Sequence, residues 1–453
     1  MDIGKTLISV VDEGLGNSTY LLDLGDGRAL AVDAPRDLRA VRQAAARRGL
    51  TIVYAADTHL HADFLSGAVQ LAAIDGAQIL ASAAGNRRFE HRGLRDGDEI
   101  DLGGLTLQAW ATPGHTDEHL SFVVKDGSRP LGVFSGGSLI VGSAARTDLL
   151  GDDRTIELAH AQYASLQRLA TLPDATALWP THGAGSFCSA PSGSARTSTI
   201  GAEKAGNALL SAPDAGTFTR LLTAPLGSYP DYFRWLSEAN RIGAPVIKSE
   251  PVLATLIVDE VRALMASGAA VIDVRPIADV AKGHLPGAVS IALRPQFATW
   301  LGWVINPDTP LIIVRNGNQH PADILWPAYN IGYTNFLGEL AGGVDAWTSA
   351  GHSLVTAALT APGSVGGRVL DVRQDSEYVT GHLPEAIHIQ LGELTEDAAD
   401  MGTGPVTVMC GHGERAMTAA TLLQRQGHSQ VSVLDGGVKD WAAATGNRPE
   451  RGV

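Results

Sequence analysis

The chain has 453 residues, of which 45% are hydrophobic and 18% charged, a composition typical of a globular α/β protein. At about 150 residues per domain, this length predicts two to four domains. The net charge of −14 repels nucleic-acid phosphates and anionic lipid surfaces, so we expect neither as a partner and expect small molecules as substrates.

The N-terminal sequence MDIGKTLISVVDEGLG has early acidic residues and no basic segment before an apolar core, which argues against a secretory signal. No apolar run reaches the length of about 18 residues that a membrane-spanning helix needs. We therefore predict a cytoplasmic protein, and the oligomeric state stays open, with a homo-oligomer as one outcome. The two cysteines, Cys188 and Cys410, are too few for a disulfide framework, so both are expected as free thiols.

The first part of the chain alternates strand-like runs with Gly/Asp turns. The runs TLISVV, STYLLDL and ALAVDA, the last two separated by the turn Gly25–Gly27, predict hairpins at the edge of a sheet. A basic amphipathic helix is expected near Arg36–Arg48, and a buried strand, TIVYAAD, follows it. That strand leads into THLHADF, so polar residues gather at a strand's carboxyl end, where open α/β folds place their sites.

THLHADF, which holds His59, resembles the His-x-His-x-Asp-His signature of the metallo-β-lactamase fold. Pro113-Gly114-His115-Thr116 resembles the next ligand loop of that family, and Trp179–Gly183 resembles its last histidine loop. Between them, VFSGGSLIVGSAARTDLL resembles the stretch that supplies a carboxylate in persulfide dioxygenases. The resemblance covers residues 5–240 and implies an αββα sandwich over residues 1–245.

Persulfide dioxygenases of this fold use one iron held by two histidines and a carboxylate, which leaves positions open for a thiolate and dioxygen. The resemblance implies His59 and His115 as the two histidines and Fe(II) as the metal. The carboxylate position falls on Gly137, so either another donor completes the site or the domain binds no metal. Three further donors lie in the same motifs: His61, Asp63 and His182.

Phe64 stands where the signature has its last histidine, which argues against a two-metal hydrolase site. Zinc is the alternative to iron as the metal of this domain. Cys188 follows His182 by six residues in HGAGSFC. We hypothesise that its thiol lies at the rim of the metal cleft, where it could hold or pass sulfur, and the alternative is ordinary burial.

Ser186–Thr199 is interpreted as a long functional loop within the first domain, with helix resuming in GAEKAGNALL.

The second half contains an internal repeat. VIDVRPIADVAKGHLPGAVSI begins at Val271 and LDVRQDSEYVTGHLPEAIHI at Leu370, and GGVDAW and GGVKDW follow in the same order at Gly342 and Gly436. Each copy alternates strands and helices, which predicts two small α/β domains with parallel sheets, over residues 246–357 and 358–453.

The repeat resembles the rhodanese family, whose landmarks are DVR, GHLPGA, a strand that ends in cysteine, and a closing GG-V-x-x-W. In the second copy VTVMC ends at Cys410, and GHGER then places Arg415 at the start of a helical run. A helix N-terminus and a neighbouring arginine stabilise a thiolate, so Cys410 is the predicted nucleophile and Arg415 its charge partner. The intervening residues are expected to bind a persulfide through backbone N–H groups: Gly411, His412, Gly413 and Glu414.

In the first copy the equivalent strand reads LIIVRNGNQH, with Arg315 or Asn316 in place of the cysteine. This copy therefore lacks the nucleophile, and we interpret it as a packing spacer or a docking surface.

The whole architecture resembles a persulfide dioxygenase–rhodanese fusion with a cysteine-less rhodanese domain in the middle. The resemblance implies that a low-molecular-weight thiol persulfide is oxidised by O2 to sulfite, and that Cys410 transfers sulfane sulfur to sulfite to give thiosulfate. Three alternatives stay open: a sulfurtransferase with a metal-free first domain, a glyoxalase II-like thioester hydrolase, and a sulfur-carrying binding module.

Overall fold

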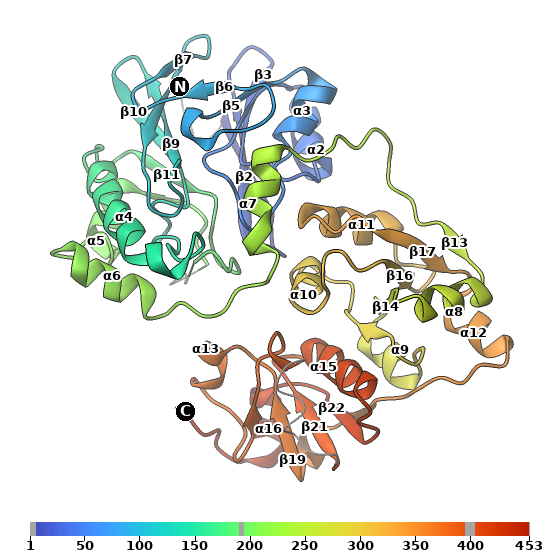
Figure 1. Ribbon diagram of the computed structural model, residues 1–453. Helices are drawn as coiled ribbons and strands as arrows, with labels where there is room; N and C mark the ends of the chain where they lie inside the picture. The colour runs from blue at the N-terminus through green and yellow to red at the C-terminus, as the bar shows by residue number, and fades with distance from the viewer. Residues whose placement is uncertain (1–5, 190–193, 395–403, 453) are drawn as a thin grey trace. The chain divides into compact units, whose positions relative to one another are not determined.

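The computed structural model describes residues 6–189, 194–394 and 404–452 (Figure 1). The chain divides into two compact units, one of residues 1–249 with 329–332 and the other of residues 250–328 with 333–453. None of the helices in these described ranges has the length and apolarity needed to cross a membrane.

The first unit contains two six-stranded sheets, in the orders β1-β2-β3-β4-β5-β6 and β12-β11-β10-β9-β8-β7. The antiparallel pairs β1–β2 and β2–β3 at the start of the first sheet confirm the predicted hairpins. The strands of the two sheets are β1 Leu7–Asp12, β2 Asn17–Asp23, β3 Arg28–Val32, β4 Thr51–Ala56, β5 Gln78–Ser82, β6 Arg92–Leu94, β7 Glu99–Asp101, β8 Thr106–Ala111, β9 Leu120–Asp126, β10 Arg129–Gly136, β11 Ala177–Pro180 and β12 Ser198–Thr199.

Alternating side chains place the core of this unit between the two sheets. Tyr20 of β2 and Phe122 of β9 belong to the same buried cluster, whereas their neighbours Leu21 and Val123 face the helices that cover the outer sides. Because successive strand residues point to opposite faces, each strand contributes to two hydrophobic layers. The expected αββα sandwich is confirmed.

The helices of the first unit cover the outer faces of the sheets, and in Figure 1 α2 and α3 lie beside β3–β5 while α4 lies beside β9–β11. Their bounds are α2 Arg39–Arg47, α3 Ala68–Asp75, α4 Thr155–Leu169, α5 Ile200–Gly206, α6 Ala215–Thr223 and α7 Phe233–Ile242, with short 3-10 turns at η1 Ala83–Gly85 and η2 Asp152–Arg154.

Three local predictions need correction. The helix expected near Arg36–Arg48 begins only at Arg39, because Pro35 pairs with Ser66 in an isolated antiparallel bridge that keeps the chain before the helix extended. The predicted loop Ser186–Thr199 ends in strand β12, which pairs with β11, and its residues 190–193 lie outside the described part of the chain. The helix expected through GAEKAGNALL stops at Gly206, because the Asn207 side chain accepts the backbone N–H groups of the next turn.

The second unit contains two five-stranded parallel sheets with the same topology, β13-β17-β16-β14-β15 and β18-β22-β21-β19-β20. Corresponding strands occur in the same chain order in both, so the internal repeat is confirmed as two copies of one α/β domain. The strands are β13 Thr255–Leu256, β14 Ala270–Asp273, β15 Val289–Ser290, β16 Leu311–Val314, β17 Phe336–Leu340, β18 Ala358–Thr360, β19 Arg368–Asp371, β20 Ile387–His388, β21 Val406–Met409 and β22 Val431–Leu434.

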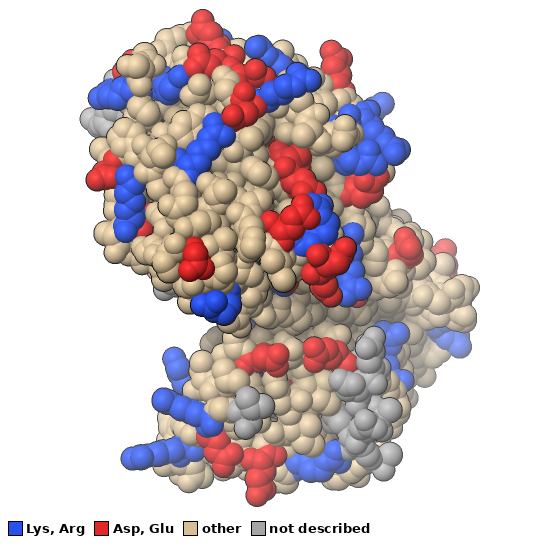
Figure 2. All heavy atoms as spheres, turned by 60° about the vertical axis from the view of Figure 1, so that its left-hand side comes forward, with Lys and Arg blue, Asp and Glu red and all other residues tan. Residues whose placement is uncertain are grey.

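The helices of these two domains are α8 Val258–Ala266, α9 Ile277–Lys282, α10 Phe297–Val304, α11 Pro321–Asn330, α12 Gly343–Ser349, α13 Asp375–Tyr378, α15 Glu414–Arg425 and α16 Val438–Thr445, with a 3-10 turn at η3 Pro362–Ser364. On the face of the molecule in Figure 2, acidic and basic side chains are interspersed, and no continuous basic patch is visible there.

Candidate metal and thiol sites

Three histidines from separate loops of the first domain converge on one buried point. His59 follows β4, His115 lies between β8 and β9, and His182 follows β11; each offers a ring nitrogen, and these nitrogens lie within 4.8 Å of one another. The Nε2 atoms of His59 and His182 are 3.3 Å apart. All three side chains are buried.

Each of the three rings is held through its Nδ1 atom. Nδ1 of His115 lies 2.7 Å from the carbonyl oxygen of Arg146, Nδ1 of His182 lies 2.9 Å from Oδ1 of Asn17, and Nδ1 of His59 lies 2.9 Å from Oγ1 of Thr58. Such bonds fix the tautomer and orientation of metal-binding histidines, and they leave Nε2 as the lone-pair donor.

The polar atoms of this cluster fit a metal ion. Nε2 of His115 is buried and has no hydrogen-bond partner within the described residues. An unpartnered buried nitrogen is costly, and a bound cation would satisfy it. Three imidazoles suit zinc as well as iron, so the donor set is compatible with either metal and does not choose between the two.

Burial keeps the imidazoles of His59 and His115 neutral, which is the form that binds metal. Burial, reinforced by the nearby His182, lowers the pKa of His115 to about 3. Burial also lowers the pKa of His59 well below its usual value, with His61 and His115 adding to the effect.

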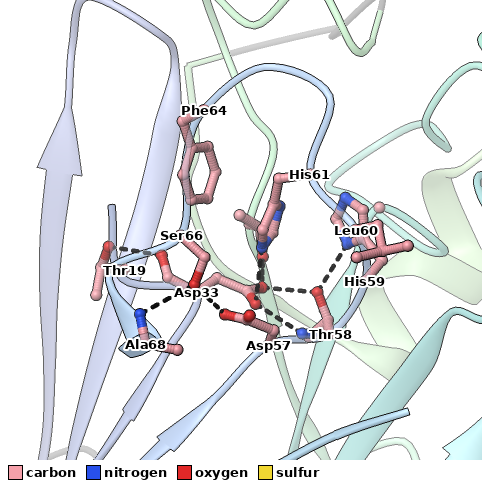
Figure 3. Close-up of polar contacts among 12 residues, drawn as sticks. Thr19, Asp33, Asp57, Thr58, His59, Leu60, His61, Phe64, Ser66 and Ala68 are labelled. Carbon is pink, nitrogen blue, oxygen red and sulfur yellow. Dashed lines mark hydrogen bonds and ion pairs between the residues drawn. The ribbon is translucent and has the colours of Figure 1, made fainter. Parts of the chain in front are cut away.

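His61 is turned onto a buried carboxylate (Figure 3). Its Nε2 lies 3.2 Å from Oδ1 of Asp33, and its ring stacks on Phe64 with a centroid distance of 4.1 Å. Burial opposes the charged form of both groups, but the attraction and hydrogen bond between them outweigh burial. The pKa of His61 is therefore raised and that of Asp33 is lowered. Asp33 also accepts hydrogen bonds from Thr58 and Thr181, which ties the loops of two metal-site histidines together.

Asp63 lies behind His182. Its Oδ2 accepts a 2.7 Å hydrogen bond from Nδ2 of Asn17 and lies 3.4 Å from Nδ1 of His182. Burial raises the pKa of Asp63, but His182 and its other partners outweigh burial and hold that pKa below its usual range. Asp63 is thus placed where the carboxylate behind a metal-binding histidine would lie. His61, Asp63 and His182 also form a second cluster of potential ligand atoms.

Gly137 lies directly against the site. Its backbone N–H donates to Nε2 of His119 at 3.0 Å, and its carbonyl accepts from Nε2 of Gln162 at 3.2 Å. Gln162 of α4 also accepts the backbone N–H of His115 at 2.7 Å through Oε1. One amide side chain therefore links the Gly137 loop to the His115 loop.

Cys188 is fully buried. Burial, and next the nearby carboxylate of Asp63, raises the pKa of its thiol well above the usual value. Its backbone carbonyl accepts the N–H of Arg146, the residue whose own carbonyl holds His115. The thiol therefore lies near the Asp63 side of the cluster, in its protonated form.

Sequence reasoning missed four residues of this site: Asn17, Asp33, His119 and Gln162. Asp33 carried a signal, because it is an acidic residue at the carboxyl end of a buried strand, in ALAVDAP. Its φ of 52° marks it further in the structure. Asn17 and Gln162 carried no such signal, because each acts on a residue that is distant in the sequence. Asn17 bonds Asp63, 46 positions away, and Gln162 bonds His115, 47 positions away.

In the third domain, Cys410 follows strand β21 directly and precedes helix α15. Within the predicted persulfide-binding loop, the backbone N–H of Gly413 points at Sγ of Cys410 at 3.1 Å, and Gly413 has a φ of 99°, which favours glycine. Arg415 is bound bidentately by Glu377, at 2.6 and 2.8 Å. A helix N-terminus and a fixed guanidinium thus lie beside the thiol.

Sheet register identifies the residue that replaces the cysteine in the second domain. Asp371 pairs with Met409 and Asp273 pairs with Val314, so Cys410 corresponds to Arg315 rather than Asn316. Arg315 forms an ion pair with Glu339 of the adjacent strand.

The comparisons with known proteins agree with this architecture. The family model of the rhodanese-like domain matches residues 258–350 and 355–444. A crystal structure of a metallo-β-lactamase from Staphylococcus aureus is similar to the chain with a TM-score of 0.64 and 29% identity, over 74% of this chain and 98% of that one. The chain joins a metallo-β-lactamase-fold domain to two rhodanese-like domains.

The metallo-β-lactamase-fold domain has curated relatives of two kinds. It is 32% identical to human mitochondrial persulfide dioxygenase ETHE1 over 173 residues, and 35% identical to a hydroxyacylglutathione hydrolase of Acidiphilium cryptum over 168 residues. Each match covers 36% of this chain and 63% of the relative, so the chain spans less than two thirds of the relatives' length. ETHE1 from Myxococcus xanthus is structurally similar at 30% identity and a TM-score of 0.45, over 52% of this chain and 97% of that one.

Proposed function

We propose that this protein oxidises a low-molecular-weight thiol persulfide with O2 in its metallo-β-lactamase-fold domain and transfers sulfane sulfur through Cys410 in its second rhodanese-like domain. The observation that carries the first activity is the set of three converging, buried histidines with one unpartnered Nε2. The similarity to persulfide dioxygenases supports the substrate class.

For the metal we propose Fe(II), held by His59, His115 and His182. A bound iron would supply redox chemistry and open coordination positions for the persulfide sulfur and dioxygen. In balance, persulfide, dioxygen and water give thiol, sulfite and protons. The chain's own groups orient the site: Asn17 and Asp63 hold His182, the Arg146 carbonyl holds His115, and burial excludes bulk water.

This ligand set differs from the one expected from the family resemblance, because His182 takes the place of a carboxylate at position 137. Asp63 and His61 were the other donors considered, and neither needs to rotate inward: Asp63 backs His182, and His61 bonds Asp33. The anionic character of the site then comes from Asp63 behind the histidine rather than from a direct carboxylate ligand.

For the second activity we propose sulfur transfer by the Cys410 thiolate. The thiolate attacks the outer sulfur of a persulfide, the donor's S–S bond breaks, and the donor thiolate leaves. Sulfite then attacks the sulfur held on Cys410, a new S–S bond forms thiosulfate, and the Cys410 thiolate is regenerated. The N–H of Gly413, 3.1 Å from Sγ, is placed to stabilise the anionic sulfur at both stages.

The test is metal analysis of protein purified without oxygen from iron-supplemented cells, combined with oxygen uptake on addition of glutathione persulfide. We expect about one iron per chain and oxygen uptake that His115→Ala abolishes, while Cys410→Ser abolishes thiosulfate formation alone. Metal-free protein that consumes no oxygen but still makes thiosulfate would leave a sulfurtransferase with an inactive first domain.

The similarity to hydroxyacylglutathione hydrolases favours one alternative, a zinc thioester hydrolase. Phe64 opposes it, because its ring stacks on His61 where the two-metal signature has a histidine. Zinc-dependent release of thiol from a glutathione thioester, with no oxygen uptake on persulfide, would establish the hydrolase instead.

A further inference from the structure

The segment that follows Cys410 packs against the cysteine-less rhodanese-like domain, which belongs to the same compact unit. Thr421 Oγ1 accepts the backbone N–H of Ser290 on β15 at 3.0 Å, and Oε1 of Gln424 lies 3.0 Å from Nε2 of His284. Helix α15 is therefore attached to the neighbouring domain along its length, well beyond the Cys410 loop itself.

The loop residues make three further contacts of this kind. A Cβ atom on Gly413 would lie 2.9 Å from Cδ1 of Ile277, so the loop backbone touches the start of α9. Oε1 of Glu414 lies 3.4 Å from Nη1 of Arg294. The guanidinium carbon of Arg415 lies 5.2 Å from the ring centroid of Trp300 in α10, within range of a cation–π interaction.

Arg415 is consequently held from two directions. Glu377 of its own domain binds two of its nitrogens, and Trp300 of the cysteine-less domain covers the guanidinium. A Cβ atom on Gly411 would lie 3.4 Å from Nη2 of Arg415, so the guanidinium lies close to the Cys410 loop. The orientation of the one arginine in the loop motif thus depends on both domains.

Trp300 itself is 91% buried, and its Nε1 has no hydrogen-bond partner among the described residues. A buried indole N–H normally finds a partner.

The two cations in this region, Arg294 and Arg415, are matched by Glu414 and Glu377, so the loop gains no net charge from them. These two arginines therefore add no excess positive charge, and what Arg415 offers an anionic sulfur donor or acceptor is the placement of its guanidinium beside the Cys410 loop.

We propose that the cysteine-less domain completes the Cys410 site, with Trp300 as a positioning residue that holds Arg415 for the anionic donor and acceptor of sulfur. This inference rests on the proposed transfer through Cys410. It gives the domain a role beyond a packing spacer, and it accounts for a domain that keeps its fold after losing the nucleophile.

The experiment compares Trp300→Leu and Trp300→Phe in the full-length protein, with Cys410 loaded from glutathione persulfide and discharged by sulfite. We expect Trp300→Leu to raise the KM for sulfite at least fivefold, while kcat changes by less than threefold. Trp300→Phe keeps an aromatic face and should restore KM to within about twofold of the parent. The matched control is Trp347→Phe, because Trp347 lies in the core of the same domain and bonds the Ser353 carbonyl.

Three outcomes would overturn the inference: a Trp300→Leu protein with unchanged KM, a Trp300→Phe protein as impaired as Trp300→Leu, or the same loss in the Trp347→Phe control. If Trp300→Leu does not fold, Trp300→Met serves as the second variant, because it keeps a long apolar side chain but removes the aromatic face over Arg415, and an unchanged KM for sulfite there would contradict the proposal. Cys410→Ser separates the two ideas, since thiosulfate formation without this thiol would refute the proposed transfer rather than the role of Trp300.

Discussion

The ring of His115 occupies the space that a side chain at position 137 would need. A Cβ atom on Gly137 would lie 2.3 Å from Cδ2 of His115 and 3.0 Å from its Nε2. Real Cβ atoms do not approach so closely, so even alanine at this position requires the histidine to move. The position of the His115 ring therefore requires glycine where the family resemblance places a carboxylate, and His182 supplies the third nitrogen of the cluster.

Gly137→Ala should therefore lower metal occupancy although it removes no ligand. The added methyl group displaces the His115 ring from its bond with the Arg146 carbonyl, and overpacking of this kind costs about 1–3 kcal/mol. We expect metal content to fall several-fold, measured by mass spectrometry after equilibration with a limiting chelator. Gly206→Ala is the matched control, because a Cβ atom there would meet nothing within 4 Å. Full occupancy in Gly137→Ala would contradict this assignment of His115.

Asp63→Asn should weaken metal binding without removing a direct ligand. Asparagine keeps the size of the side chain but loses the charge behind His182, and changes to such partners typically cost 10- to 100-fold in metal affinity. The measurement is competition with a chelator of known affinity, with surface Asp126→Asn as the control. Loss of all binding would instead indicate that Asp63 is itself a ligand, through the cluster that it forms with His61 and His182.

The sequence predicted the fold more fully than the site. The repeated DVR–GHLP pattern and the alternation of strands and helices are local signals that predict the two parallel-sheet domains, and the histidine motifs carry the resemblance that implies the sandwich. The site depends on contacts between distant residues: Asn17 holds His182 across 165 positions, and Gln162 holds His115 across 47. The motifs therefore located the loops, whereas the choice among His61, Asp63 and His182 required their orientation in space.

Glu377→Gln should slow sulfur transfer and remove a pH-dependent contribution to stability. Burial raises the pKa of Glu377, but its bonds to Arg415 outweigh burial and hold that pKa below the usual value. A carboxylate with a lowered folded-state pKa stabilises the fold above its unfolded-state pKa, about 4.3, and loses this effect as the pH falls through the folded-state value. The parent should melt at a higher temperature than the variant at pH 7, and the difference should shrink below about pH 4. An equal difference at both pH values would contradict the ion-pair explanation.

Cys188 should resist alkylation in the native protein. Its side chain is fully buried, and burial raises the pKa of its thiol, so at pH 8 it is neither accessible nor ionised. We expect iodoacetamide to label Cys188 only after denaturation, as read by peptide mass spectrometry, and we expect Cys188→Ser to leave oxygen uptake on persulfide unchanged within about twofold. Rapid native labelling, or loss of oxygen uptake in the variant, would restore the hypothesis that this thiol handles sulfur.

Arg315→Cys should not create a second sulfur-transfer site, although sheet register places residue 315 at the position of Cys410. Residues 315–320 separate β16 from α11, whereas only residues 410–413 separate β21 from α15. Gln319 occupies the longer loop and bonds both the carbonyl of Val274 and the N–H of Asn316, so this N–H is already engaged, whereas the N–H of Gly413 points at Sγ. A thiol there would lack the anion-binding loop that transfer requires.

The test of this last prediction uses a Cys410→Ser background, in which transfer through the second rhodanese-like domain is absent. Thiosulfate formation should stay at background after Arg315→Cys is added, and Arg315→Ser provides a control for the loss of the ion pair with Glu339. Transfer above about one tenth of the parent rate would show that a cysteine at the end of this strand is sufficient, and that the geometry of the Cys410 loop contributes little.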